Sequence, residues 1–315
     1  MTLTEAPPRR HFLSLADLSP DEVRAVLDAA TAIRTGELRP DLNGRSLVLL
    51  LEKPSLRTRV SFELGMRKMG GHSLSMLPQE VGLGGREPPE DVARVLSRYA
   101  DVIAARVNSH DTLVALANAA DVPVINALSD IEHPCQILAD LQAIREHFGT
   151  LEGLAIAFIG DGNNVAASLA LGCALVGATL RIASPVGYEL PGNIVAQATR
   201  LAGQEGNVPQ LFVKPEDAVE GADVVYTDVW ASMGQEAERE QRARDFRGYQ
   251  INPHLMELAD PKAVFMHDLP AHEGEEISEG MLTHPQSIVF NQAENRMHAQ
   301  AALIATLLGA IPSAS

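Results

Sequence analysis

A five-residue segment, S-L-R-T-R at positions 55–59, brings together residue types that bind anions. It follows the apolar run 46–51, which predicts a buried strand, and it lies where a helix is expected to begin. The free N–H groups of a helix start, the hydroxyls of Ser55 and Thr58 and the guanidinium group of Arg57 would together cradle a small anion. The alternative is an N-cap serine followed by solvated arginines, and this segment alone leaves both interpretations open.

Three further polar residues follow apolar runs in the first half of the chain. Arg106 ends one of these runs, where it would either bind the same anion or form a salt bridge. His133 and Gln136 follow the run 122–127 and are three residues apart, so they would share one face of a first helical turn. Directed at one ligand, they would polarise a carbonyl group, and a capping interaction is the alternative.

The second half of the chain places a glycine pair and two acids after its apolar runs. The glycine pair, Gly160 and Gly162, lacks the third glycine of a dinucleotide-binding fingerprint, and the next run ends at Ser184 rather than at an acid. Asp228 ends a later run and precedes the small residues of D-V-W-A-S-M-G. The motif H-D-L-P then places Asp268 at the end of another predicted strand.

These residues are positioned by a regular alternation of apolar runs and helical patterns. The runs predict strands at 46–51, 101–106, 122–127, 154–160, 179–184, 222–228, 263–268 and 287–292, with helical patterns between most of them and an amphipathic helix at 293–310. Such alternation predicts parallel sheets covered on both faces. Because the pattern restarts after residue 147, we expect two doubly wound α/β domains, 1–147 and 148–293, with an active-site cleft between them.

The composition excludes several classes of protein. The chain has 315 residues and a net charge of −16, which argues against nucleic-acid binding but still allows an arginine cluster to hold an anionic substrate. Cys135 and Cys173 lie in apolar helical segments without a C-x-x-C motif, so buried thiols are expected rather than a zinc site or disulfides. No signal peptide and no run of ~18 apolar residues is present, so we expect no membrane partner and a cytoplasmic location.

Together the motifs resemble those of the aspartate/ornithine carbamoyltransferase family. S-L-R-T-R, H-P-C-Q (133–136), D-V-W-A-S-M-G-Q-E (228–236) and H-D-L-P (267–270) occur at fitting intervals, the likeness covers nearly the whole chain, and the S-M-G loop points to ornithine. The resemblance implies transfer of a carbamoyl group from carbamoyl phosphate to the δ-amino group of L-ornithine, giving L-citrulline and phosphate. This reaction belongs to arginine biosynthesis and urea-type pathways, and it requires no metal or other cofactor.

The resemblance also implies an assembly and a set of site residues. It implies a homotrimer or a multiple of trimers, a loop near 79–87 that enters the neighbouring site, and a final helix, 294–315, that packs on the first domain. Carbamoyl phosphate would be bound by Ser55, the backbone of Leu56, Arg57, Thr58, Arg106, His133, Gln136, the carbonyl group of Leu269, and Arg296. L-Ornithine would be bound by Asn164, Asp228, Ser232 and Met233, and the catalytic residues would be Arg106, His133, Asp228 and Asp268. The attacking amine must be neutral, so activity should rise toward alkaline pH.

Two departures from the family pattern concern the phosphate and the neighbouring loop. Leu56 stands where many members have threonine, which is harmless if the backbone N–H group is the ligand. Gly82 stands where a glutamine commonly precedes L-G, and Gln79 or Arg86 would have to substitute for it.

A third departure concerns the amine, because Asp268 replaces the cysteine of the family's H-C-L-P motif. Two acids, Asp228 and Asp268, would favour the ammonium form of the substrate and oppose its attack. Alternatively the two carboxyl groups share a proton, leaving one as a neutral donor or a base. In a third interpretation only the backbone matters: Leu269 supplies its carbonyl group, and Pro270, preceded by a cis bond in the family, sets the turn.

Three competing hypotheses follow from these departures. The first is a carbamoyltransferase for another amine, such as putrescine or a modified ornithine. The second is a non-catalytic homologue that retains the carbamoyl phosphate site, which only Asp268 supports. The third is a nucleotide-dependent oxidoreductase, which the incomplete glycine motif disfavours.

Overall fold

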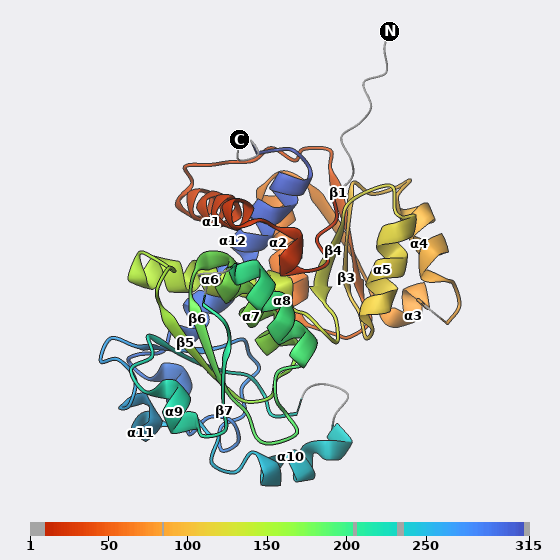
Figure 1. Cartoon of the computed structure of the whole chain (residues 1–315). Helices are drawn as coiled ribbons and strands as arrows, with labels where there is room; N and C mark the ends of the chain where they lie inside the picture. The colour runs from red at the N-terminus through yellow and green to blue at the C-terminus, as the bar shows by residue number, and fades with distance from the viewer. Residues whose placement is uncertain (1–9, 84, 204–206, 232–235, 312–315) are drawn as a thin grey trace. The chain divides into compact units, whose positions relative to one another are not determined.

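The computed structural model of the protein describes residues 10–83, 85–203, 207–231 and 236–311. The chain forms two compact units, one made of Met1–Cys135 with Met297–Ser315 and the other of Gln136–Arg296. Each unit contains one parallel sheet with flanking helices, so the predicted fold class of two doubly wound α/β units is confirmed (Figure 1). The functional domain boundary expected between residues 147 and 148 stays a prediction.

The sheet of the first unit has four parallel strands in the order β2-β1-β3-β4. Their bounds are His72–Met76 for β2, Ser46–Leu51 for β1, Val102–Arg106 for β3 and Val124–Leu128 for β4. The chain leaves β1 in opposite directions to reach β2 and β3, which makes the β1/β3 pair the point where the strand order reverses. Leu51 at the end of β1 pairs with Arg106 at the end of β3, so both strands end at one edge. Ligands of open α/β sheets bind at such a point, beyond the carboxyl ends of the strands.

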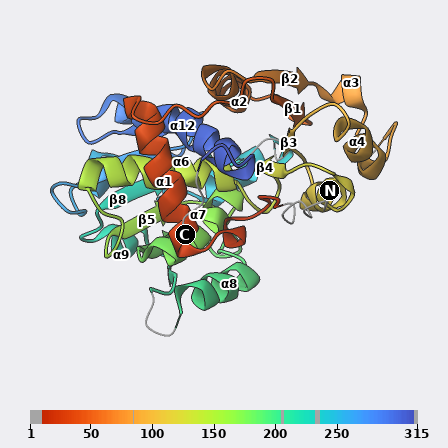
Figure 2. The same cartoon turned by 90° about the horizontal axis from the view of Figure 1, so that it is seen from above.

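Helices cover both faces of this sheet. They are the 3-10 helix η1 (Leu15–Asp17), α1 (Pro20–Thr35), α2 (Leu56–Lys68), α3 (Pro78–Val81), α4 (Pro89–Leu96), α5 (His110–Ala119) and the C-terminal part of α12 (Val289–Leu307). Helices α4 and α5 pack on one face, where they enclose Val48, Leu50 and Ile103, while α1 and α12 lie toward the other (Figure 1). Figure 2 shows α2 beside the edge strand β2.

A glycine allows α12 to approach α2 closely. A Cβ atom at Gly65 would lie 3.3 Å from the carbonyl oxygen of Met297 and 3.7 Å from the Cβ of Ala301. A side chain at position 65 would therefore force the two helices apart.

The sheet of the second unit has five parallel strands in the order β7-β6-β5-β8-β9. Their bounds are Gln210–Phe212 for β7, Thr179–Ala183 for β6, Ala155–Ile159 for β5, Val224–Thr227 for β8 and Val264–His267 for β9. The strand order reverses between β5 and β8. Thr227 pairs with His267, so β8 and β9 end side by side, and the residues that follow them lie at one edge.

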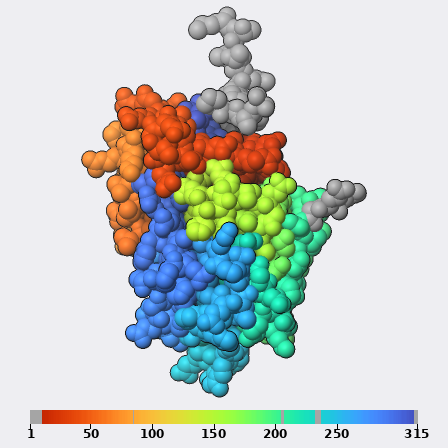
Figure 3. Space-filling model, turned by 90° about the vertical axis from the view of Figure 1, so that its left-hand side faces the viewer, coloured from red at the N-terminus to blue at the C-terminus, as the bar shows by residue number. Residues whose placement is uncertain are grey.

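Helices and short helical turns cover both faces of the second sheet. They are α6 (Pro134–Phe148), α7 (Asn164–Val176), α8 (Gly192–Ala202), α9 (Pro215–Val219), the 3-10 helix η2 (Glu236–Glu238), α10 (Arg239–Asp245), α11 (Pro253–Met256) and the 3-10 helix η3 (Met281–Thr283). Every residue of α7 after Asn164 is buried, as its apolar sequence requires. The hydrophobic core on the other face of the sheet contains Val225, Phe265, Trp230 and Phe246. The visible side of this unit in Figure 3 is covered largely by its later segments, drawn in shades of blue.

Three sequence-based assignments differ from the structure. The strand predicted at 287–292 is wrong: Ser287 forms only an isolated bridge to Phe265, and α12 begins at Val289. The run S-I-V-F is too short to separate a strand from a helix start by periodicity. Strands β2 and β7 were not predicted, because both are short edge strands, and the alternating H-S-L-S-M of β2 is largely solvent-accessible.

Two expectations from composition can be compared with the structure. Cys135 and Cys173 are both free and buried, as expected. Burial raises the pKa of the Cys173 thiol to about 12, so this thiol is unreactive. Among the described residues, no helix is long and apolar enough to cross a membrane.

Candidate active site

The segment after β1 starts a helix and exposes hydrogen-bond donors, as the sequence predicted. Ser55 is the N-cap of α2, and its Oγ atom accepts the N–H group of Thr58 at 3.3 Å. Thr58 is fully buried, whereas the side chain of Leu56 is 76% exposed. The serine therefore caps the helix and lies at the anion-binding end of it, so the two interpretations of this segment do not exclude one another.

Arg106 lies beside this helix start because β3 ends next to β1. The backbone N–H group of Glu52 donates to the carbonyl oxygen of Arg106 at 2.8 Å, which fixes the two strand ends together. Arg106 is buried. A buried guanidinium group next to a helix N-terminus at a switch point concentrates positive charge in a protein whose net charge is −16. This is the arrangement that a small dianion requires.

His133 and Gln136 lie at the start of α6, as predicted, and both are buried. The loop that leads to them is held by Ser129, whose N–H group donates to the carbonyl oxygen of Glu132 at 2.9 Å. Glu132 in turn accepts the N–H group of Leu15 at 3.3 Å. Gln136 points its Nε2 atom at Asp140, one turn further along α6, with a distance of 2.8 Å to Oδ1.

In the second unit, Asp228 follows β8 and lies next to the residues that follow β5. Its Oδ2 atom accepts the side-chain N–H group of Asn163 at 2.8 Å, and its Oδ1 atom accepts the N–H group of Val229 at 2.7 Å. The loops after β5 and β8 therefore meet at the switch point of this sheet. Asn164, the residue expected to bind ornithine, is the half-buried first residue of α7, and the contact of its neighbour Asn163 with Asp228 was not predicted.

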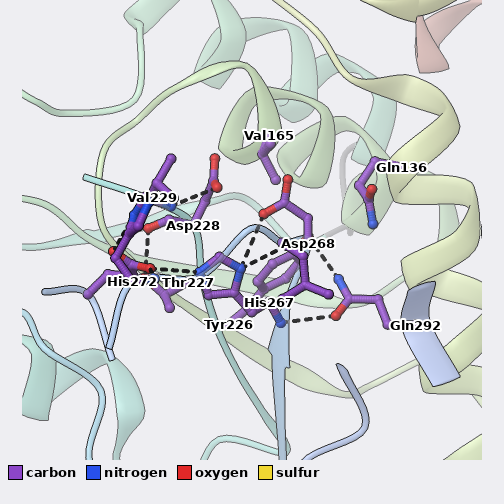
Figure 4. Close-up of polar contacts among 12 residues, drawn as sticks. Gln136, Val165, Tyr226, Thr227, Asp228, Val229, His267, Asp268, His272 and Gln292 are labelled. Carbon is purple, nitrogen blue, oxygen red and sulfur yellow. Dashed lines mark hydrogen bonds and ion pairs between the residues drawn. The ribbon is translucent and has the colours of Figure 1, made fainter. Parts of the chain in front are cut away.

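Asp268 follows β9 and forms a carboxyl pair with Asp228, and both side chains are buried (Figure 4). Burial raises the pKa of Asp268 well above its ordinary value, and the charge of Asp228 and a hydrogen bond to it raise it further. These surroundings favour the protonated form of the Asp268 carboxyl group. The shared proton stays a prediction, as do the other two interpretations of this substitution.

His267 holds the turn that contains Asp268. Its Nδ1 atom accepts the N–H group of Leu269 at 2.9 Å, which leaves Nε2 to donate to Glu276 at 3.2 Å. Leu269 has a left-handed backbone with φ of 62°, and its bond to Pro270 is cis. The contact from His267 thus stabilises a backbone conformation that non-glycine residues rarely adopt.

The cluster of Asp228, His267 and Asp268 also has the composition of a metal site. Their ligand atoms lie within 4.8 Å of one another. However, the Nδ1 lone pair of His267 already accepts the N–H group of Leu269. Burial and the charge of Asp228 also favour the protonated form of Asp268, which is a poor metal ligand.

A buried polar network behind Gln136 was not predicted from the sequence. Asp140 accepts hydrogen bonds from Gln136 Nε2 at 2.8 Å, Tyr226 Oη at 2.8 Å and Gln292 Nε2 at 2.9 Å. Burial raises the pKa of Asp140 to about 6, against the opposing effect of these three donors. The signal that could have found it is an acid four residues after Gln136 on an otherwise apolar helix.

The remaining predicted residues are placed as follows. Arg296 is buried on α12, and its positive charge lowers the pKa values of Asp140 and Asp268 against the effect of burial. Ser232 and Met233 lie outside the described residues. The segments on either side of them are joined by the buried Arg242, which donates to Asp161 at 2.6 Å and to the carbonyl oxygen of Trp230 at 3.0 Å.

The incomplete glycine motif after β5 has a packing role. A Cβ atom at Gly162 would lie 2.4 Å from the backbone nitrogen of Leu190, so only glycine fits there. The motif is therefore explained without a nucleotide.

Comparison with known proteins adds a family to this geometry. Residues 10–146 match the carbamoyl-P binding domain of aspartate/ornithine carbamoyltransferases, and residues 152–307 match their Asp/Orn binding domain. The chain is 51% identical over 303 residues to an ornithine carbamoyltransferase of Parasynechococcus marenigrum, covering 96% of this chain and 95% of that one. It is 52% identical over 299 residues to the ornithine carbamoyltransferase of Thermosynechococcus vestitus, covering 95% and 96%. The solved ornithine carbamoyltransferase of Pyrococcus furiosus superposes with a TM-score of 0.92 at 45% identity, covering 96% and 98%.

These matches span both units of the structure. The chain belongs to the aspartate/ornithine carbamoyltransferase family, as its motifs indicated. The relatives that it resembles along nearly its whole length carry the name ornithine carbamoyltransferase. The oxidoreductase hypothesis is therefore rejected.

Proposed function

We propose that this protein transfers the carbamoyl group of carbamoyl phosphate to the δ-amino group of L-ornithine, giving L-citrulline and phosphate. The observation that carries the proposal is the chemistry at the two switch points. A buried arginine and a capped helix start lie in the first unit, and the buried carboxyl groups of Asp228 and Asp268 lie close together in the second. Full-length identity of about half to named ornithine carbamoyltransferases supports the choice of substrates.

Carbamoyl phosphate would be held first by its phosphate group. Ser55, Arg57 and Thr58 lie at the start of α2, where N–H groups and the helix dipole favour a dianion. The exposed side chain of Leu56 does not obstruct its own N–H group, so the missing threonine is no obstacle to binding. Arg106 would bridge the phosphate and the carbonyl oxygen.

The carbamoyl group would be oriented by four further residues. His133 and Arg106 would stabilise the negative charge that develops on the carbonyl oxygen during attack. Gln136 and the carbonyl group of Leu269 would accept hydrogen bonds from the carbamoyl NH2, and Arg296 would complete the charge compensation. The C–N bond forms as the bond between the carbamoyl carbon and the phosphate oxygen breaks, and the departing phosphate accepts the proton that the amine nitrogen loses.

L-Ornithine would be recognised by the polar residues of the second unit. Asn164 would bind the α-carboxylate, Asp228 the α-amino group, and Ser232 with the backbone of Met233 the rest. Asp268 would lie near the δ-amino group, in the place of the family's cysteine. The raised pKa of Asp268 favours its protonated form, and a pair with one negative charge rather than two would have a weaker preference for the ammonium form.

We also propose that the enzyme is a cytoplasmic homotrimer, or a multiple of trimers. The exposed apolar side chains of Val60, Leu64 and Leu74 on α2 and β2 support a subunit interface in the first unit. The loop near 79–87 would enter the neighbouring site.

A citrulline assay tests the proposed function. Purified protein is incubated with carbamoyl phosphate and L-ornithine between pH 6 and 9.5, and with putrescine and an N-acylated ornithine as competing acceptors. We expect citrulline with ornithine alone, and turnover that rises toward alkaline pH as the amine becomes neutral. Preferred carbamoylation of another amine would identify a different acceptor, and binding of carbamoyl phosphate without turnover would identify a non-catalytic homologue.

A further inference from the structure

The carboxylate of Asp140 is completely enclosed and accepts three hydrogen bonds. Oδ1 accepts the side-chain N–H groups of Gln136 at 2.8 Å and Gln292 at 2.9 Å, and Oδ2 accepts the hydroxyl of Tyr226 at 2.8 Å. Nothing of its side chain is exposed. A buried acid is costly to a fold unless it is satisfied in this way, so its presence calls for a reason.

An ionised carboxylate fixes the orientation of both amide side chains that contact it. It can only accept hydrogen bonds, so Gln136 and Gln292 must each turn their NH2 group toward it and their oxygen away. The second amide verifies this assignment, because Oε1 of Gln292 accepts the N–H group of His267 at 2.9 Å. By the same argument, Oε1 of Gln136 points away from Asp140.

The Oε1 atom of Gln136 is buried and has no hydrogen-bond partner among the residues that the structure describes. A buried acceptor of this kind costs free energy unless a ligand supplies a donor. The carbamoyl NH2 group is such a donor, whereas the phosphate oxygens of the same substrate are not.

We propose that Asp140 is the positioning residue for carbamoyl recognition: it locks the Gln136 amide so that its oxygen, and never its NH2 group, faces the carbamoyl nitrogen. This inference rests on the proposed function. Asp140 acts through Gln136 and does not itself touch the substrate.

The same carboxylate also contacts a second amide, which is not proposed to touch the substrate. Gln292 joins Oδ1 of Asp140 to the backbone of His267, the last residue of β9. The effect of Asp140 on carbamoyl recognition is therefore expected through Gln136 alone.

The test compares Asp140→Leu with Gln136→Leu and the double variant in steady-state carbamoyl transfer. We expect D140L to lower kcat/KM for carbamoyl phosphate by about 10-fold or more, with KM for ornithine within about 2-fold of wild type. The double variant should be no worse than Q136L alone, because Asp140 acts only through Gln136. Asp140→Asn provides the comparison if D140L does not fold, since its amide can offer an N–H group to Gln136 and reverse it, at a cost of about 3- to 10-fold.

Tyr226→Phe is the matched control. It removes one donor from Oδ2 of Asp140 and leaves the contact of Oδ1 with Gln136 in place. We expect a lower melting temperature and kcat/KM for carbamoyl phosphate within about 2-fold of wild type. The inference is overturned if D140L or D140N retains wild-type kcat/KM, or if the losses in Q136L and D140L add in the double variant. A wild-type protein that carbamoylates no acceptor would instead overturn the proposed function.

Discussion

The side chain of Asn163 joins the start of α7 to Asp228. Its Nδ2 atom donates to Oδ2 of Asp228 at 2.8 Å, while its Oδ1 atom accepts the N–H groups of Val165 at 3.0 Å and Ala166 at 3.1 Å. Because the two N–H groups fix the amide orientation, the donor must point at Asp228. One residue thus serves the stability of a helix and the orientation of a carboxylate proposed to bind ornithine.

Replacing Asn163 by alanine should impair both functions. We expect a loss of about 1–2 kcal/mol in the free energy of unfolding from the missing cap. We also expect KM for ornithine to rise by about 10-fold, because Asp228 loses a donor that orients it. Urea unfolding and steady-state kinetics measure the two effects separately.

Asn163→Ser is the control for this prediction. Serine is also a good N-cap, but its hydroxyl is too short to cap the helix and reach Asp228 together. Stability should recover while KM for ornithine stays high. Recovery of both quantities would show that Asn163 only caps the helix.

The carboxyl pair predicts different outcomes for its two members. Asp268→Asn places a neutral hydrogen-bond donor beside Asp228, as a protonated Asp268 would. We therefore expect kcat/KM for ornithine to stay within about 5-fold of wild type. Asp228→Asn removes the charge that binds the amine and should lower kcat/KM by about 100-fold. Both substitutions preserve shape, so the comparison isolates charge and proton position.

The pH profile adds a second readout to this pair. Burial and the charge of Asp228 raise the pKa of Asp268 well above its ordinary value, which favours a proton shared by the pair. If the pair holds that proton, the activity profiles of wild type and D268N should coincide between pH 6 and 8. A large loss in D268N would mean that Asp268 accepts the proton of the attacking amine.

Much of the fold follows from local sequence patterns. The central strands of both sheets are mostly apolar, because strands covered on both faces have no polar side. Edge strand β2 was not predicted because its sequence alternates polar and apolar residues. The segment at 287–292 was assigned to a strand because short apolar runs fit either structure, whereas only Ser287 forms a bridge to Phe265 and α12 begins at Val289.

The candidate site was predicted only where a motif or a strand end marked it. Arg106, Asp228 and Asp268 lie at strand ends, where topology alone suggests function. Asp140 and Gln292 lie neither at a strand end nor in a recognised motif. They belong to helices, and their roles depend on tertiary hydrogen bonds. The raised pKa of Asp268 also depends on burial and on the nearby charge of Asp228, which no spacing along the chain reveals.

The apolar surface of α2 predicts an effect on assembly. Val60 and Leu64 are one helical turn apart and are 42% and 44% exposed, and Leu74 on the edge strand is 59% exposed. The double variant Val60→Glu with Leu64→Glu should place charges in the proposed interface and shift the mass from trimer toward monomer. Analytical ultracentrifugation at micromolar protein measures the shift.

Val186→Glu is the control for the assembly prediction. Val186 is 78% exposed in the second unit, outside the proposed interface. Its substitution should leave the mass of the assembly unchanged. A trimer that survives the double substitution on α2 would exclude this surface as the subunit interface.

Burial of Asp140 should make the stability of the protein depend on pH. The ionised form, which is proposed to orient Gln136, is also the form that destabilises the fold. Burial raises its pKa from 3.8 to about 6 in the folded state, so the folded protein holds this proton more tightly than the unfolded chain. The contribution of this raised pKa to the free energy of unfolding is complete below pH 3.8 and is lost as the pH rises through about 6. A difference of about 2 in pKa corresponds to ~3 kcal/mol, which the folded state loses at pH 8.

Asp140→Asn removes this titration while keeping the size of the side chain. The free energy of unfolding of D140N minus that of wild type should therefore increase by about 1–2 kcal/mol between pH 5 and pH 8, because only wild type carries the buried charge at the higher pH. Urea unfolding at the two pH values measures the difference. A variant that gains relative stability at pH 8 yet loses carbamoyl phosphate affinity would show that the charge is retained for orientation of Gln136 rather than for stability. A difference independent of pH would mean that Asp140 titrates normally in the folded protein.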